Sequence, residues 1–166
     1  MYCCLGLEDQ KDLSYKYVNL LKQSGTQNFG NSVVYDKDLG VYVGDPGAKT
    51  VYRYTYVKPG TIGAALDTIN TYQYKESVYV NTSGFGTAMA KSDDVIVITS
   101  PNSSNSYIYI GVLHPSSHKS FIVQQTISIS SKRVGDAVAL SGDKKWLYLS
   151  STSEAKVYVY RLDDNV

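Results

Sequence analysis

Residues 134–160 read VGDAVALSGDKKWLYLSSTSEAKVYVY in one-letter code. The stretch opens on Val134-Gly135 and continues as a small alternating segment, a short turn that contains Asp143, and the apolar run Trp146–Leu149. After a break of small residues comes Val157–Tyr160, in which valine and tyrosine alternate. Alternation with a period of two is typical of β-strands, and small polar turn residues between strands favour hairpins. The stretch therefore predicts three short strands joined by tight turns.

The same pattern occurs twice earlier in the chain, beginning at Phe29-Gly30 and at Phe85-Gly86. In these two copies a fourth alternating segment follows, at Tyr72–Val80 and at Phe121–Ser130. A period of about 50 residues with several strands per unit is the signature of a β-propeller blade. The sequence thus predicts an all-β fold with about three four-stranded antiparallel blades, forming a propeller that is partial or is completed by other chains.

We predict four segments along the chain. Residues 1–28 form an N-terminal segment in which a strand at Tyr15–Leu21 completes a blade, residues 29–84 form blade repeat 1, residues 85–133 form blade repeat 2, and residues 134–166 form blade repeat 3, which lacks its fourth strand. Propellers have four to eight blades, so three blades do not close a ring. We expect either that a longer polypeptide completes the ring or that two identical chains associate to give six blades.

Composition argues against several classes of protein. The formal net charge is +1 and no stripe of basic residues occurs, so we expect no binding to nucleic acid. No run of about 18 apolar residues is present, so we expect no membrane insertion, and no secretory signal is recognisable at the N-terminus. The two cysteines, Cys3 and Cys4, are adjacent, and a disulfide between neighbours would constrain almost no loop.

Together, Phe-Gly, a small alternating strand, an acidic turn, an apolar run and a Val-Tyr-x-Tyr strand resemble the FG-GAP-like repeat. The resemblance covers about residues 29–166 and is best in Phe29–Tyr56 and Val134–Tyr160, although Val134 replaces the usual aromatic residue. The segment Ala137–Leu149 is similar to the version found in large virion proteins of tailed bacteriophages.

This resemblance implies a non-enzymatic structural or adhesion module, most simply a tail- or capsid-associated bacteriophage virion protein. Its partners would be other virion subunits or copies of itself, and a host-surface glycan or receptor would be a further partner. The implied location is the virion, and the alternative is the extracellular space or a cell surface, as part of a longer chain.

The acidic turns do not predict a metal site. Integrin-type relatives of the repeat hold calcium in a long loop between the first two strands, and calcium needs six to eight oxygen ligands. The equivalent turns here are too short to wrap an ion, and their aspartates are Asp36 and Asp38, Asp93 and Asp94, and Asp143. We expect these carboxylates to accept hydrogen bonds from backbone N–H groups within the hairpins.

Catalytic groupings are not recognisable in the sequence. His114 and His118 are four residues apart, but Pro115 and the serines between them disfavour the helix that would bring both imidazoles together on zinc. No Gly-x-Ser-x-Gly elbow and no phosphate-binding glycine loop occurs. We therefore predict no enzymatic activity and no cofactor. The alternative function is a carbohydrate-binding or carbohydrate-cleaving propeller, in which aromatic and carboxylate side chains from separate blades converge.

Two groups of residues are candidates for contacts. The tyrosines of the Val-Tyr-x-Tyr strands share one face of each blade, which predicts packing between neighbouring blades, and a stacking platform for sugar rings is the alternative. Three polar loops, at 45–49, 101–106 and 150–155, occupy equivalent places in the repeats. Within them the candidate partner-binding residues are Asp45, Lys49, Asn102, Asn105, Ser153 and Glu154.

Overall fold

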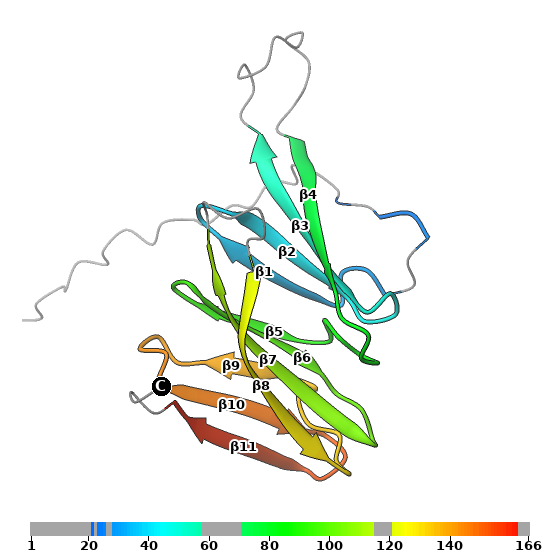
Figure 1. Ribbon diagram of the computed structural model, residues 1–166, viewed down its shortest axis with the longest axis vertical. Helices are drawn as coiled ribbons and strands as arrows, with labels where there is room; N and C mark the ends of the chain where they lie inside the picture. The colour runs from blue at the N-terminus through cyan, green and yellow to red at the C-terminus, as the bar shows by residue number, and fades with distance from the viewer. Residues whose placement is uncertain (1–20, 22, 26–27, 58–70, 115–120, 163–166) are drawn as a thin grey trace, which may run out of the picture.

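A computed structural model describes residues 21, 23–25, 28–57, 71–114 and 121–162 of the chain. These residues form eleven strands in three antiparallel sheets (Figure 1), so the predicted all-β fold with four-stranded antiparallel sheets is confirmed. Within the described residues no helix is long and apolar enough to cross a membrane. The predicted strand at Tyr15–Leu21 and both cysteines fall outside the described residues, apart from Leu21 itself.

Each sheet is a simple meander in which consecutive strands are neighbours. The first sheet contains β1 (Ser32–Asp36), β2 (Gly40–Asp45), β3 (Thr50–Val57) and β4 (Thr71–Tyr79). The second contains β5 (Met89–Ser92), β6 (Val95–Ser100), β7 (Asn105–Leu113) and β8 (Phe121–Ser130). The third contains β9 (Val138–Leu140), β10 (Trp146–Ser151) and β11 (Lys156–Arg161).

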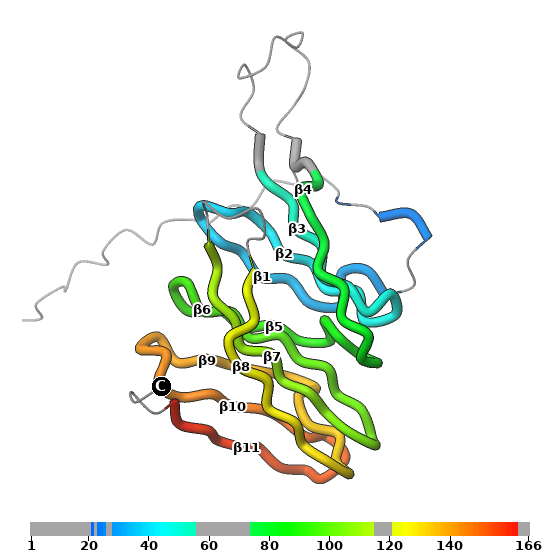
Figure 2. The backbone as a smooth tube through the Cα atoms, in the orientation of Figure 1, coloured from blue at the N-terminus to red at the C-terminus, as the bar shows by residue number. Residues whose placement is uncertain are grey.

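The three sheets stack on one another in sequence order, as Figures 1 and 2 show. The first strands of the sheets lie next to each other, since β5 contacts β1 on one side and β9 on the other. Each sheet falls within one of the predicted repeats, and the third has three strands among the described residues. The exact repeat boundaries stay a prediction.

Two hydrophobic clusters hold the stack together. One fills the space between the first and second sheets, and its buried residues are Leu39, Tyr42, Val51, Phe85, Ile96, Ile98, Tyr109, Leu113 and Phe121. The other lies between the second and third sheets and contains Val97, Ile108, Ile110, Val134, Leu147 and Leu149. The central strands β6 and β7 of the second sheet are thus buried on both faces, which explains why β6 is a continuous apolar run and not an apolar–polar alternation.

Because consecutive strands are antiparallel, the connections between them lie alternately on two opposite sides of the stack. The turns β1–β2, β5–β6 and β9–β10 lie on one side, which we call the turn rim (Figure 1). The loops β2–β3, β6–β7 and β10–β11 lie on the opposite side, which we call the loop rim. The predicted partner-binding loops therefore share one rim.

The glycine of the Phe-Gly pair allows each sheet to approach the one before it. Gly86 has a φ of 91° and Gly135 a φ of 100°, in the left-handed region that glycine adopts easily. The Ser32 hydroxyl donates to the Gly86 carbonyl at 2.7 Å, and the Thr99 hydroxyl donates to the Gly135 carbonyl at 2.7 Å. The motif is therefore a backbone contact between neighbouring sheets.

Replacing Gly44 by alanine should destabilise the protein strongly. A Cβ at this position would lie 2.2 Å from the Gly86 carbonyl oxygen and would force the first two sheets apart. We expect a loss of about 3 kcal/mol in the free energy of unfolding, at the upper end for overpacking, measured by urea denaturation. Gly142→Ala is the matched control, because its Cβ would meet nothing within 4 Å. Equal stability of the two variants would contradict the proposed contact.

Candidate functional site

The loop rim contains the predicted partner-binding residues, and Asp45 is the exception among them because it is fully buried. Its Oδ1 accepts hydrogen bonds from the backbone N–H groups of Ala48 at 3.1 Å and Asn28 at 3.3 Å. Its Oδ2 is buried without a hydrogen-bond partner among the described residues. A partner cannot reach Asp45 in this structure, so its role is to hold the β2–β3 loop.

Lys49 lies in the same loop and reaches the surface. It adopts a left-handed backbone conformation with a φ of 54°, and its Nζ donates to Asn81 Oδ1 at 3.0 Å. The backbone carbonyl of Lys49 accepts from Val80 N, which ties the β2–β3 loop to the segment after β4. The exposed ammonium and amide are thus held in place on the loop rim.

Some polar side chains of the β6–β7 loop form hydrogen bonds within the protein, and others are exposed to solvent. Asn102 Oδ1 accepts from the backbone N–H of Ser104, so its side chain stabilises the turn, and Asn105 is exposed at the start of β7. The buried Ser106 hydroxyl accepts from Val134 N at 2.9 Å and donates to the Lys132 carbonyl at 2.8 Å. This loop is therefore anchored to the entry of the third sheet.

The β10–β11 loop presents a small charged network. Glu154 accepts a hydrogen bond from the Tyr158 hydroxyl, and the Nζ of Lys132 lies 3.6 Å from its carboxylate. The hydrogen bond from Tyr158 lowers the pKa of Glu154, and the charges of Lys132 and Lys156 lower it further. Ser153 is exposed beside this network. Ser153 is therefore exposed and Glu154 partly buried on the loop rim, and their binding to a partner stays a prediction.

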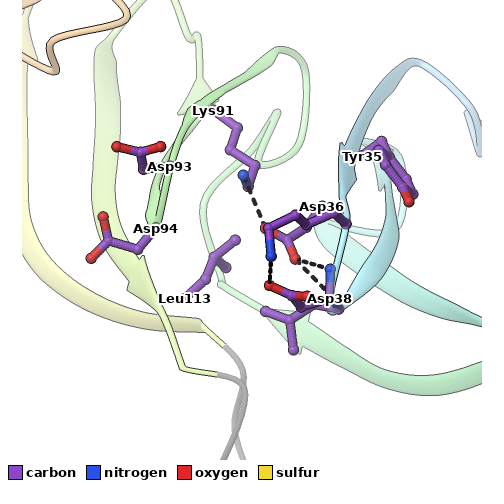
Figure 3. A pocket seen from close by; sticks show the side chains of 9 residues that line it. Tyr35, Asp36, Asp38, Lys91, Asp93, Asp94 and Leu113 are labelled. Carbon is purple, nitrogen blue, oxygen red and sulfur yellow. Dashed lines mark hydrogen bonds and ion pairs between the residues drawn. The ribbon is translucent and has the colours of Figure 1, made fainter.

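The turn rim contains a cleft that the sequence did not predict. Its volume is about 490 Å³, and Figure 3 shows the side chains around it. The lining comes from the β1–β2 turn, the β5–β6 turn and the end of β7, and consists of Tyr35, Asp36, Lys37, Asp38, Leu39, Lys91, Asp93, Asp94 and Leu113. Four carboxylates and two ammonium groups therefore surround one hollow.

Asp36 is the most connected of these carboxylates. Its Oδ1 accepts from the backbone N–H groups of Asp38 and Leu39, both at 2.8 Å, and its Oδ2 lies 2.9 Å from Lys91 Nζ in the next sheet (Figure 3). Burial tends to raise the pKa of Asp36, but the hydrogen bond from Lys91 and the two backbone hydrogen bonds outweigh it and lower the pKa. The expected capping of the turn is present, together with an unexpected ion pair between sheets.

An equivalent ion pair joins the second and third sheets. Lys144 Nζ lies 2.9 Å from Asp94 and 3.4 Å from Asp93, and the hydrogen bond with Lys144 lowers the pKa of Asp94. In Figure 3 the carboxylates of Asp93 and Asp94 point away from the Asp36–Lys91 pair. The Asp36–Lys91 pair therefore joins the two turns that border the cleft, whereas Asp93 and Asp94 pair with Lys144, which is not part of the lining.

Sequence reasoning missed these pairs because each joins residues of different repeats. Lys91 lies in the second repeat and Asp36 in the first, and the two turns differ in length, so no fixed spacing signals the contact. The described residues contain no group of three or more His, Cys, Asp or Glu side chains arranged to hold a metal ion. His114 directly follows β7 and is partly buried, whereas His118 lies outside the described residues.

The repeated tyrosines of the second and third sheets pack against the preceding sheet. Tyr109 belongs to the cluster between the first two sheets, Tyr107 packs against it, and Tyr158 and Tyr160 pack against the second cluster. The Phe85 and Tyr109 rings meet edge to face with centroids 5.3 Å apart, and the Phe29 and Tyr52 rings do the same at 5.7 Å. For the second and third sheets these contacts agree with the predicted packing role.

Comparison with known proteins supplies the architecture. No protein-family model matches the sequence, and no curated protein matches it. Two solved structures are similar in fold, the β-propeller domain of Cps50 (Swd1) from Myceliophteria thermophila and a chain of the mitotic checkpoint complex. The chain has a β-propeller fold. Its three sheets are therefore blades, and their adjacent first strands line the inner side of an arc.

The match is partial in both cases. The Cps50 domain is 12% identical over 79% of this chain with a TM-score of 0.51, and the checkpoint chain is 19% identical over 80% with a TM-score of 0.50. This chain spans only 39% of the former and 36% of the latter. At these identities the comparison establishes the fold alone.

Asp36→Asn should weaken the protein at neutral pH and much less in acid. A pKa lowered in the folded state means that the ionised carboxylate stabilises the fold above the ordinary value of 3.8 and loses this effect as the pH falls through the folded-state pKa. We expect the free energy of unfolding to fall by about 1–3 kcal/mol at pH 7, and we expect this difference between variant and original chain to become smaller below pH 3.8. Denaturant unfolding over a pH series measures it.

Asp38→Asn is the matched control within the same turn. Among the described residues its carboxylate pairs with Lys37, and both side chains are more than half exposed. We therefore expect the free energy of unfolding to change by about 0.5 kcal/mol or less. A loss for Asp36→Asn that is constant across the pH series would contradict the role given to its charge.

Proposed function

We propose that this chain is a non-enzymatic interaction module in which stacked propeller blades present a rigid loop rim to a protein partner. The observation that carries the proposal is the construction of the loop rim. Its loops are anchored by buried groups, such as Asp45 and Ser106, while Lys49, Asn105 and Ser153 reach the surface. Loops held in one conformation lose little entropy when they bind, which favours recognition.

The surface chemistry of the loop rim suits a polar partner. Lys49 offers an ammonium group beside the Asn81 amide, and Glu154 offers a carboxylate whose pKa is held low by Tyr158 and the neighbouring lysines. Charges of both signs on separate blades favour a partner of complementary pattern over a uniformly charged polymer. This agrees with the balanced charge of the chain, which is +1 overall.

We further propose that the partner is a virion subunit and that the chain is a tail- or capsid-associated bacteriophage protein. The support is the similarity of Ala137–Leu149 to repeats of large phage virion proteins. In the structure this segment forms β9, the β9–β10 turn and most of β10. A structural role in a particle is compatible with a core filled by side chains, in which the repeated elements pack against each other.

Sedimentation of particles tests this proposal. Lysates of the source organism's infected cells are separated on a density gradient, and peptides of this chain are quantified by mass spectrometry across the fractions. We expect the chain to peak with assembled particles in constant ratio to their major protein. Recovery in the slowly sedimenting fractions alone would contradict the virion assignment.

The loop rim is tested in the same experiment. A triple variant, Lys49→Ala, Asn105→Ala and Ser153→Ala, removes three side chains of the loop rim. The Ser153 hydroxyl lies 3.3 Å from that of the buried Ser151, so circular dichroism is used to check that the variant is folded. We expect it to sediment less with particles than the original chain. A triple variant that sediments as the original does would assign particle binding to another surface.

A further inference from the structure

Each of the two outermost sheet faces of the blade stack has apolar side chains that are exposed to solvent. On the outer face of the first blade, which we call the leading face, Val33, Tyr35, Tyr74 and Tyr79 are exposed. On the outer face of the third blade, which we call the trailing face, Trp146, Tyr148, Val157 and Val159 are exposed. On the leading face the two exposed groups lie on the edge strands β1 and β4, with the buried Val43 and Tyr54 between them. On the trailing face Tyr148 and Val159 are direct neighbours in the ladder, and exposed apolar side chains that lie together on a sheet mark an interaction surface.

The trailing face repeats the positions that the inner blades bury. The amides of Gly30, Gly86 and Gly135 donate to the carbonyls of Gly44, Thr99 and Ser150, which places these three residues at equivalent points of their blades. Opposite them in the ladder stand Val51, Ile108 and Val157. Val51 and Ile108 are 2% and 0% exposed because a following blade covers them, whereas Val157 is 64% exposed.

The leading face exposes positions that the second and third blades bury against the blade before them. Val33, Met89 and Val138 pair with Val43, Ile98 and Leu149 at equivalent points of the three blades. Met89 and Val138 pack into the clusters against the preceding blade, whereas Val33 is 59% exposed. A Cβ added at Gly30 would meet nothing within 4 Å, whereas at Gly86 and Gly135 it would meet the preceding blade.

The turns at the two ends of the stack each contain charges of both signs. Within the stack, Lys144 of one turn pairs with Asp93 and Asp94 in the turn of the preceding blade. At the leading end the exposed Lys37 lies in the β1–β2 turn, 2.6 Å from Asp38, and at the trailing end Asp143 lies in the β9–β10 turn before Lys144 and Lys145. A blade that follows the third one would therefore bring a lysine toward Asp143 if it carried the β1–β2 turn.

We propose that a second copy of this chain docks with its leading face on the trailing face. This contact repeats the packing seen twice within the stack. The leading face of one copy would therefore cover the trailing face of the next. Two such contacts, one at each end, would close a ring of six blades, and propellers have four to eight. Head-to-tail contacts produce closed rings when the rotation closes. The inference rests on the fold and concerns sheet faces, so it stands apart from the loop rim.

Light scattering coupled to size-exclusion chromatography tests the contact. The chain has a mass of 18.3 kDa, so the proposal predicts a particle of twice that mass. Val33→Lys on the leading face and Val159→Lys on the trailing face should each give folded monomers, because both valines are more than half exposed within one chain. The same change at the exposed Val123 of β8, away from both faces, should leave the dimer intact.

Mixing the two variants identifies the geometry. Val33→Lys keeps an intact trailing face and Val159→Lys keeps an intact leading face, so the mixture should form a heterodimer through one good contact. Dimerisation of Val33→Lys alone would indicate trailing face on trailing face and would overturn the head-to-tail contact. An original chain that remains an 18.3 kDa monomer at about 100 μM, about tenfold above a weak micromolar Kd, would overturn the proposal as a whole.

Discussion

The contact between a Phe-Gly glycine and the backbone of the preceding blade is the constraint on which the rest of the structure depends. Gly86 fits against Gly44, where any Cβ would collide with a carbonyl oxygen, and Gly135 fits against Thr99. This close approach sets the distance between sheets, and the aromatic or branched residue before each glycine then fills the space beside it. Phe85 and Val134 are both fully buried for this reason.

An ion pair joins each blade to the next, although different positions of the repeat supply the charged residues. The ion pair of Asp36 with Lys91 joins blades one and two, and Asp94 with Lys144 joins blades two and three. Because the first pair is largely buried and the second largely exposed, they contribute unequally to stability. The apolar clusters supply most of the cohesion, and the pairs on the turn rim align neighbouring turns. The loop rim, on the other side, is left to present polar side chains.

The fold was predictable from the sequence because its signals are local and repeated. The run Val95–Ile98 and the alternation at Tyr107–Ile110 predict that β6 and β7 are strands. The repeat period of about 50 residues predicts that each group of strands forms one blade. Burial of Asp45 was not predictable, because it depends on how the β2–β3 loop folds back over its own carboxylate. The Asp36–Lys91 pair was equally hidden, since it joins two turns of different length. Asn105 and Ser153 are exposed and Lys49 is half-buried, and their predicted role in partner binding stays a prediction.

The central claim is that the blades form one cooperative stack in which the second is covered on both faces. Hydrogen exchange measured strand by strand tests it, since amides that open only by global unfolding exchange most slowly. We predict that β6 and β7 exchange most slowly and at a common rate with β2 and β10, while the outer strands β4 and β11 exchange faster. Exchange of β2, β6 and β10 at three separate rates would contradict the claim, because each blade would then open on its own.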